Sequence, residues 1–565
     1  DSQLILLAYA KWGEDAPKRL VGDFAFMIWD EREQKLFGAR DFSGARSLYY
    51  CSTDHRFAFC TVLNPLLTVP YVSDALQEQW IAEYLAIPSV TDSVDCSITV
   101  YKDIRQIPPS HIIKVQGRNI TLTRYFQFAR EEPLRLKTNQ DYVEAFLDVY
   151  RTAITARLRT HREVGALLSG GLDSGSVVSI AARELGKVQK PLHSFSYIPV
   201  QDYIDWTPKH LVPNEKPYIQ STVSYVGNIH DRYLDFQGRS PYSEIDSSLE
   251  LMEMPYKIFE NSFWINGIHE AAQQRGIGIL LTGARGNLTV SWGWALSFYA
   301  SQLKRMRWIR LYREMQLYCK NVGAGRKQFL KAIIQKAYPN LVGRTEQDAN
   351  LFPSIIHPAL AQRTDVYRKL QEQGIDTSGF SLPKDVFEAR RKHFEDTHTW
   401  NLNGVSGTRK SLRYHLWNRD PTNDVRVIRF CLSVPEEQFV LDGADRALIR
   451  RAMEGLLPDE IRLNQRVRGI QGADVMQRMA PVWELFLDES RSMCSDQDMA
   501  SYIHVPALRQ AIDAISGDRR PVSPFDNNFN IVMRSLILYR FLKKSPLKGG
   551  DSCAQGMVET GVGSS

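Results

Sequence analysis

Between residues 141 and 281 the chain alternates short apolar runs with segments whose apolar residues recur at helical spacing. The spacing predicts strands at 164–168, 193–198, 231–235 and 277–281. It predicts helices from residue 141 onward and at 176–185, 218–225 and 263–274. Neighbouring parallel strands need long connections, which helices provide, so this alternation predicts a parallel sheet covered by helices.

The flanking regions have different patterns. Residues 1–125 carry short β-type runs, such as 24–29 and 111–115, separated by turn signals. From Leu296 the pattern is mostly helical, and residues 547–565 are rich in Gly and Ser. We therefore expect an α/β protein with a β-rich domain over 1–130, a parallel-sheet domain with a large helical C-terminal part over 138–546, and a disordered tail over 547–565.

Composition excludes several protein classes. With 43% hydrophobic and 24% charged residues the chain is globular, and its net charge of +6 is too small to indicate a nucleic-acid binder. The charge-free stretch 287–303 is shorter than the ~20 apolar residues of a membrane span, so we expect none. Seven Cys without a C-x-x-C pair predict reduced thiols in a cytoplasmic protein. The chain begins with Asp instead of Met, and we expect it to be cut from something longer.

The segment Val164-Gly-Ala-Leu-Leu-Ser-Gly-Gly-Leu-Asp-Ser174 is the strongest candidate for a chemical site. A predicted strand runs into a Gly-Gly turn and then directly into a helix, whose N-terminus favours an anion. Gly170 and Gly171 allow the backbone to approach a phosphate, and Asp173 can hold the Mg²⁺ that neutralises pyrophosphate. The simpler interpretation is a strand-to-helix turn with a capping side chain. No Gly-x-x-x-x-Gly-Lys-Ser/Thr motif occurs, so this is not a loop for γ-phosphate transfer.

Ser169-Gly-Gly-Leu-Asp-Ser174 resembles the PP-loop of the N-type ATP pyrophosphatases, which cleave ATP to AMP and pyrophosphate. Nearly the whole chain is similar to asparagine synthetase. Segments 20–30 and 37–44 resemble the glutaminase domain of that family, and His193-Ser-Phe-Ser-Tyr197 resembles its second nucleotide-site strand. Arg419-Asp-Pro-Thr-Asn-Asp424 stands where the family has Arg-Val-Pro-Phe-Leu-Asp.

This resemblance implies an Ntn-glutaminase-like domain followed by an adenine nucleotide alpha hydrolase-like PP-loop domain. It implies ATP and Mg²⁺ as cofactors, Asp173 as metal ligand and Asp424 as a catalytic residue. The residues expected to bind ATP are Leu167, Ser169, Gly170, Gly171, Leu172, Asp173, Ser174, Tyr197, Thr282 and Gly283.

Two departures from the family pattern bear on function. Leu280-Leu-Thr-Gly-Ala-Arg-Gly-Asn287 stands where an asparagine synthetase has Leu-Leu-Ser-Gly-Glu-Gly-Ser-Asp, so an active-site Glu is replaced by Ala284 and an Asp by Asn287. A glutaminase of this family also opens with a nucleophilic Cys near an Asn-Gly-Glu segment. Neither occurs here, since the first Cys is Cys51, and we expect the front domain to lack its nucleophile segment.

Three further stretches, 205–209, 286–292 and 466–474, resemble the lasso-peptide macrolactam synthetases, or lasso cyclases. Such an enzyme adenylates an Asp or Glu side chain of a precursor peptide and joins it to the peptide's own N-terminal amine. The resemblance implies a precursor peptide as substrate, with a leader-binding protein and a leader peptidase as partners. Developing negative charge needs a cation, and Arg466 and Arg468 are the candidates. A solvated surface loop is the alternative interpretation.

An N-terminal amine as nucleophile is consistent with the loss of the glutamate that Ala284 replaces. An α-amino group has a pKa of about 7.7–8.0, against about 10.4 for a lysine amine, so an N-terminal amine is partly neutral at pH 7. Loss of a base at Ala284 is therefore tolerable for such an amine. Three alternatives remain open: an ammonia-using asparagine synthetase-like enzyme, an RNA-modifying PP-loop enzyme and a non-catalytic peptide scaffold.

A basic segment lies in the helical part. Residues 301–338 contain ten Lys or Arg and one Glu, interleaved with Trp308, Tyr312, Tyr318 and Phe329. Such a segment could bind an acidic peptide or RNA. The alternative, a solvated helix face with its aromatic side chains in the core, is the usual one, and we expect no nucleic-acid partner.

Overall fold

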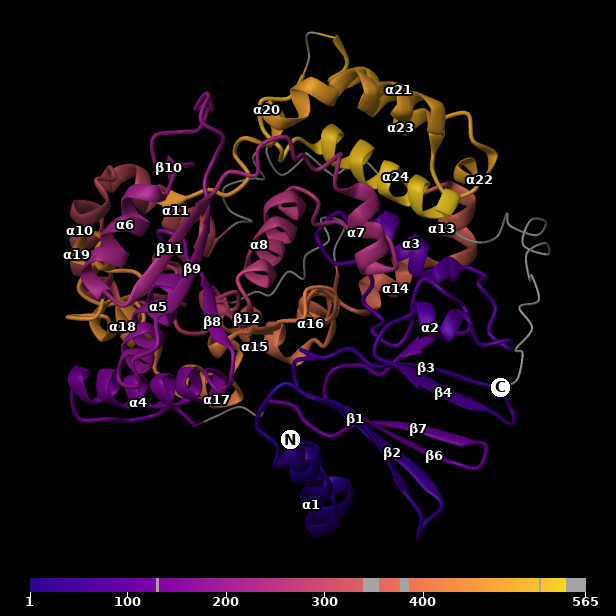
Figure 1. The fold of residues 1–565 in the computed structure, drawn as a ribbon. Helices are drawn as coiled ribbons and strands as arrows, with labels where there is room; N and C mark the ends of the chain where they lie inside the picture. Colours follow the sequence, from indigo (N-terminus) through magenta and orange to yellow (C-terminus); the bar gives the residue numbers. More distant parts are fainter. Residues whose placement is uncertain (129–131, 339–354, 376–385, 518–519, 545–565) are drawn as a thin grey trace, which may run out of the picture.

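The computed structural model describes residues 1–128, 132–338, 355–375, 386–517 and 520–544. Its N-terminal part contains two antiparallel sheets (Figure 1). One has the order β1-β2-β6-β7 and the other β4-β3-β5. Their bounds are β1 (Ala25–Asp30), β2 (Lys35–Arg40), β3 (Tyr49–Ser52), β4 (Phe57–Cys60), β5 (Arg105–Gln106), β6 (His111–Gln116) and β7 (Asn119–Arg124). The predicted β-rich front part, with strands at 24–29 and 111–115, is confirmed by β1 and β6.

The second part is built on a five-stranded sheet in which every pair of neighbours is parallel. Its order is β11-β9-β8-β12-β13. The strands are β8 (Glu163–Leu167), β9 (Leu192–Tyr197), β11 (Ile229–Leu234), β12 (Ile277–Leu281) and β13 (Trp417–Arg419). The sequence predicted four of these strands, whereas β13 lies in a region that was expected to be helical.

The order of the strands locates a ligand site. From β8 the chain adds β9 and β11 on one side, and then returns to place β12 on the other side of β8. Ligands of open α/β sheets bind at the carboxyl ends of the strands where the winding reverses. That point lies between Leu167 at the end of β8 and Leu281 at the end of β12. The predicted phosphate loop follows β8 directly.

Local sequence explains the helices that cover the sheet. Helix α4 (Asn139–Arg157) begins with a reciprocal capping box between Thr138 and Asp141. The apolar side chains that predicted it, including Phe146, Tyr150 and Ile154, are buried against Val164 and other residues of the sheet. Helices α5 (Leu172–Gly186), α6 (Lys216–Val226) and α8 (Ser262–Gln274) complete the βα units, and α5 begins four residues before its predicted start.

The remainder is mostly helical, as predicted, and none of the described helices is long and apolar enough to cross a membrane. The prediction for 547–565 lies outside the described residues. The other described α-helices are α1 (Ser2–Trp12), α2 (Asn64–Leu67), α3 (Glu78–Ala86), α7 (Ile245–Met252), α9 (Ala295–Lys304), α10 (Trp308–Val322), α11 (Arg326–Ala337), α13 (Pro358–Thr364), α14 (Val366–Glu372), α15 (Val386–Glu395), α16 (His398–Arg413), α17 (Val425–Ser433), α18 (Ala447–Ala452), α19 (Asp459–Arg462), α20 (Val475–Met479), α21 (Trp483–Met493), α22 (Gln497–Ala500), α23 (Val505–Ile515) and α24 (Asn527–Lys544).

Helix α16 joins the two parts (Figure 1). A Cβ added to Gly404 would lie 1.7 Å from the carbonyl oxygen of Gly44, so the helix backbone rests directly on a turn of the N-terminal part. The amide of Ser47 also donates a hydrogen bond to Thr408 Oγ1 at 3.1 Å. Only glycine permits this approach, which places α16 beside the carboxyl end of the sheet.

Candidate active site

The predicted phosphate loop has the compact form that an anion site requires. The Oγ atoms of Ser169 and Ser174 are 2.8 Å apart, and the amide of Ser169 donates to Ser174 Oγ at 3.1 Å. Helix α5 begins immediately afterwards, with Gly171 as N-cap and no side chain capping it. The first amides of the helix are therefore not capped by a side chain, as expected at an anion site.

A carboxylate that the sequence did not indicate lies at this loop. The amide of Gly170 donates to Glu215 Oε1 at 3.0 Å, and burial raises the pKa of Glu215 to about 7. A Cβ on Gly469 would lie 2.0 Å from the same oxygen, so Glu215 is packed between two loops. The loop around Gly469 is held there by β14 (Arg468–Gly469), which pairs with β10 (Leu211–Val212).

Asp173 lies in the first turn of α5, and its Oδ1 is buried without a hydrogen-bond partner among the described residues. Burial raises the pKa of Asp173 to about 6; the nearby Ser291 hydroxyl and Arg446 oppose this increase, whereas the charge of Asp420 adds to it. A Cβ on Gly286 would lie 2.1 Å from Asp173 Oδ1, so the segment after β12 lies directly against this carboxylate.

An orphaned buried carboxylate oxygen is consistent with a cation ligand. Within the described ranges no group of three or more His, Cys, Asp or Glu forms a complete metal site. Mg²⁺ does not need one, because it uses one or two carboxylates together with substrate phosphates and water. Asp173 and Asp420 both line the same cavity and fit this requirement.

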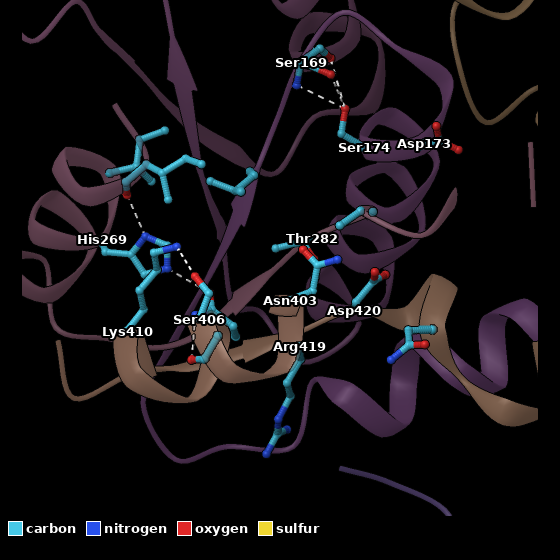
Figure 2. Close-up of a pocket in the computed structure, with 18 of the residues that line it drawn as sticks. Ser169, Asp173, Ser174, His269, Thr282, Asn403, Ser406, Lys410, Arg419 and Asp420 are labelled. Carbon is cyan, nitrogen blue, oxygen red and sulfur yellow. Dashed lines mark hydrogen bonds between the residues drawn. The ribbon is translucent and has the colours of Figure 1, made fainter. Parts of the chain in front are cut away.

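The loop opens into a cavity of about 480 Å³ (Figure 2). Of the residues predicted to bind ATP, the cavity wall includes Leu167, Ser169, Asp173, Ser174, Tyr197, Thr282 and Gly283. Gly170, Gly171 and Leu172 belong to the same turn but do not appear in the wall. The structure thus gathers most of the predicted set around one space, and ATP binding by these residues remains a prediction.

Aromatic side chains form another part of the wall. Tyr197, at the end of β9, is stacked on Trp264 with ring centroids 5.5 Å apart, and both line the cavity together with Phe195. The hydroxyl of Tyr197 donates to the buried Asp474, which holds the ring in place. Burial raises the pKa of Tyr197, and the charge of Asp474 raises it further. An apolar aromatic surface of this kind suits a flat nucleotide base.

The N-terminal part contributes Asp23, Ala45 and Arg46 to the cavity. Asp23 forms an ion pair of 2.8 Å with Arg157; burial alone would raise its pKa, but the surrounding arginines hold it below its ordinary value. Asp41 accepts hydrogen bonds from Ser43 and from the amides of Ala45 and Arg46. These contacts use both carboxylate oxygens of Asp41 to hold the turn that carries Arg46.

The far end of the cavity is formed by α8 and α16. Figure 2 shows His269, Ser406 and Lys410 at the opposite end from Ser169 and Ser174, with Thr282, Asn403 and Asp420 between them. Ala284 and Asn287, which replace the two acids of the family pattern, also line the cavity.

The three residues predicted to be catalytic lie outside this wall. Asp424 is buried as the N-cap of α17 and forms an ion pair of 2.9 Å with Arg426, whereas Asp420 of the same motif lines the cavity. Arg466 and Arg468 are both exposed. Arg466 Nε donates to the carbonyl of Asn321 at 3.0 Å, at a separate cavity lined by Lys320, Arg450, Arg451, Arg462 and Arg466 among others. Neither arginine lines the cavity, whereas Gln471 of the same segment does, and a catalytic role for the two arginines remains a prediction.

The basic segment 301–338 has features of both interpretations, a binding surface and a solvated helix face with its aromatic side chains in the core. Tyr318 and Phe329 are stacked on each other, 5.0 Å apart, against the core formed by α9, α10 and α11. Trp308 and Tyr312 are exposed. Arg305 pairs with Glu436, and Arg307 and Arg310 pair with Glu437, so part of the positive charge is neutralised within the chain.

Several site residues could not be predicted from local sequence, namely Glu215, His269, Lys410, Asp420 and Arg446. Each is distant in sequence from the loop and carries no motif of its own, apart from Asp420, which lies within the recognised motif at 419–424.

Comparison with known proteins agrees with this geometry. The asparagine synthase family matches residues 145–526, which is more than half of the chain, and the glutamine amidotransferase domain family matches residues 1–126. The chain belongs to the asparagine synthase family. Members of the asparagine synthase family with PP-loops are ATP-dependent amide-forming ligases, and this chain is one of them.

Curated relatives are distant in sequence. Asparagine synthetase [glutamine-hydrolyzing] 3 of Bacillus subtilis is 23% identical over 82% of this chain and 69% of its own length. Asparagine synthetase [glutamine-hydrolyzing] 1 of the same organism is 20% identical over 92% of this chain and 78% of its own. Amidase chry2 of Gibberella zeae is 24% identical over 50% of this chain and 41% of its own.

Proposed function

We propose that this ligase closes a macrolactam ring in a lasso precursor peptide. It activates an Asp or Glu side chain as an acyl-adenylate and joins it to the peptide's N-terminal amine. A carboxylate is a poor acyl donor, and transfer of AMP to its oxygen provides a good leaving group at the cost of pyrophosphate release. Partners expected under this proposal are a leader-binding protein and a leader peptidase.

The observation that carries the proposal is the convergence of the three segments that resemble lasso cyclases. Trp206 Nε1 donates to the carbonyl of Ala473 at 2.8 Å, which ties segment 205–209 to segment 466–474. Gly469 of the latter packs on Glu215 beside the phosphate loop, and Gly286 of the third segment packs on Asp173. Two of these segments thus reach the wall of the cavity in which adenylation would occur, through Asn287 and Gln471, and the third is tied to one of them.

The residues have distinct roles in this mechanism. The turn at Ser169–Ser174 and the start of α5 orient the phosphates, while Tyr197 and Trp264 hold the base. Asp173 and Asp420 would hold Mg²⁺, which when bound neutralises the pyrophosphate that leaves. Ala284 leaves space in the wall where the family has a glutamate, which allows a peptide to approach.

The test is turnover of ATP in the presence of defined peptides. The purified protein should form AMP and pyrophosphate only with a peptide that has a free N-terminal amine and an internal Asp or Glu. The same peptide with an acetylated amine should still support ATP–pyrophosphate exchange but give no ring. Efficient formation of asparagine from aspartate, ATP and ammonia would contradict the proposal, and salt-sensitive retention of RNA would favour an RNA-modifying enzyme.

A further inference from the structure

Lys410 occupies an unusual position for a lysine. Helix α16 places it on the wall of the cavity at the end far from the phosphate loop (Figure 2). Its Nζ donates a hydrogen bond to Ser406 Oγ at 2.6 Å. Lys410 also lines a second, smaller cavity of about 120 Å³, so it borders two cavities.

The surroundings of Lys410 do not compensate its charge. His269 faces it from α8, Lys257 lines the smaller cavity, and Arg46 and Arg419 line the larger one. In the described part of the chain no carboxylate forms an ion pair with it, and burial lowers its pKa to about 8. At neutral to slightly basic pH a substantial fraction of this amine is therefore unprotonated.

The carboxylates of the cavity wall have other tasks. Asp23 is paired with Arg157, and Glu215 accepts from the amide of Gly170. Asp420 accepts hydrogen bonds from Thr422 and from the amide of Arg285. Asp173 lies beside the phosphate loop.

His269 cannot take the role of a base. Its Nδ1 lies 2.7 Å from the carbonyl of Ile265 and its Nε2 lies 3.0 Å from Asn418 Oδ1, so both ring nitrogens are engaged. Burial, assisted by the charge of Lys410, lowers its pKa to about 4. The wall position that holds a glutamate in the family is Ala284. Lys410 is thus the group in this half of the cavity that can both reach a substrate and accept a proton.

We propose that the unprotonated amine of Lys410 is the general base of amide formation. This inference rests on the adenylation step of the proposed function. The substrate amine attacks the acyl carbon of the adenylate, a C–N bond forms, and the proton on nitrogen passes to Lys410 Nζ. The C–O bond to AMP then breaks, its electron pair leaves on the phosphate oxygen, and Ser406 Oγ accepts a hydrogen bond from the new ammonium.

The first experiment measures the protonation of Lys410 without any substrate. Lysines of the full-length protein are acetylated with trace acetic anhydride between pH 6.5 and 10.5, and mass spectrometry follows each site. Lys410 should titrate with a midpoint near pH 8, and saturating ATP should reduce its labelling. The exposed Lys187 serves as the internal reference. A midpoint above pH 10 for Lys410 would overturn the inference.

The second experiment separates adenylation from amide formation in Lys410→Met and Lys410→Arg. Both variants should retain ATP–pyrophosphate exchange within about threefold but lose amide formation by at least ~100-fold, because general base catalysis contributes about 10²–10⁴. Arginine keeps the charge but cannot lose a proton, so it should not rescue. Hydroxylamine is already neutral and does not depend on a base in this way. It should therefore restore acyl transfer in both variants, with a hydroxamate as the product. Lys187→Met is the control variant.

The outcomes distinguish this inference from the proposed function. If none of the peptides supports ATP–pyrophosphate exchange by the wild-type protein but aspartate does, the proposal of ring closure is wrong. The same variants are then tested with aspartate and ammonia. If Lys410→Arg forms amide at the wild-type rate, or if exchange and amide formation fall equally, Lys410 is not the base. If the variants lose only amide formation and hydroxylamine restores acyl transfer, the result supports Lys410 as the base, whether the substrate is a peptide or aspartate.

Discussion

Glu215 Oε1 accepts a hydrogen bond of 3.0 Å from the amide of Gly170, in the turn where a phosphate would bind. Backbone amides in such a turn stabilise an anion, and in this structure the carboxylate of the chain itself provides it. A nucleotide that enters the loop must therefore share this site with Glu215 or displace it.

The titration of Glu215 should be visible in the stability of the protein. Burial raises its pKa from 4.5 to about 7, so the folded state binds this proton more tightly than the unfolded state does. The free energy of unfolding should therefore fall as pH rises between these values. Glu215→Gln should raise Tm at pH 8 and have little effect near pH 4.5. Thermal unfolding of both proteins between pH 4.5 and 8 measures this effect, with Glu454→Gln, at an exposed glutamate, as the control. A difference in Tm that does not depend on pH would contradict the raised pKa of Glu215.

Asp173 should be essential for pyrophosphate formation but not for folding. Its Oδ1 has no partner among the described residues, so Asp173→Asn removes a metal ligand without breaking a hydrogen bond at that atom. We expect release of pyrophosphate to fall at least ~100-fold, because metal coordination of the leaving phosphates is lost. Circular dichroism should be unchanged, and Asp459→Asn, at an exposed carboxylate, should turn over normally. Wild-type pyrophosphate release in Asp173→Asn would refute the role.

Gly404 and Gly407 provide a matched pair for the junction between the two parts. A Cβ on Gly404 would lie 1.7 Å from the carbonyl oxygen of Gly44, whereas a Cβ on Gly407, one turn along α16, meets nothing within 4 Å. Gly404→Ala should destabilise by about 1–3 kcal/mol through overpacking. Gly407→Ala should be neutral or stabilising, because alanine favours a helix by about 1 kcal/mol. Denaturant unfolding of both variants checks this; equal effects would mean that the contact is not tight.

Local sequence predicted those features whose physical cause is local. The apolar runs of β8, β9 and β12 are buried on both faces, whereas in the edge strand β11 only Ile229 is buried. The Gly-Gly turn lies directly between a strand and a helix. β13 was missed because it has only three residues, Trp417–Arg419, and forms by pairing with β12 from far along the chain. No local periodicity records such a pairing.

The site could be predicted only in part for the same reason. The loop residues carry their own signal, but Glu215 and Lys410 reach the cavity through two long-range contacts, the β10–β14 pair and the packing of α16 on Gly44. Arg46 is placed there by a local turn, in which its amide donates to Asp41. Asp420 and Asp424 belong to one motif, and only burial in the folded chain distinguishes the cavity residue from the helix cap.

The two loop arginines allow a final prediction. If Arg466 stabilised the transition state, Arg466→Ala would lower kcat and kcat/KM together by about 10²–10³. In this structure Arg466 is instead exposed and donates to the carbonyl of Asn321, beside Lys320, Arg450 and other cations. A cationic surface outside the reacting atoms binds ground state and transition state alike.

We therefore expect Arg466→Ala and Arg468→Ala to raise KM for an acidic peptide several-fold while kcat changes less than about threefold. Lysine at position 466 should restore much of the affinity, because attraction at an exposed site depends mainly on charge. Steady-state kinetics at saturating ATP and two salt concentrations would decide this, since the effect on KM should shrink as salt rises. A fall in kcat of about 10² in Arg466→Ala would instead mean that segment 466–474 moves its arginine to the phosphates during turnover.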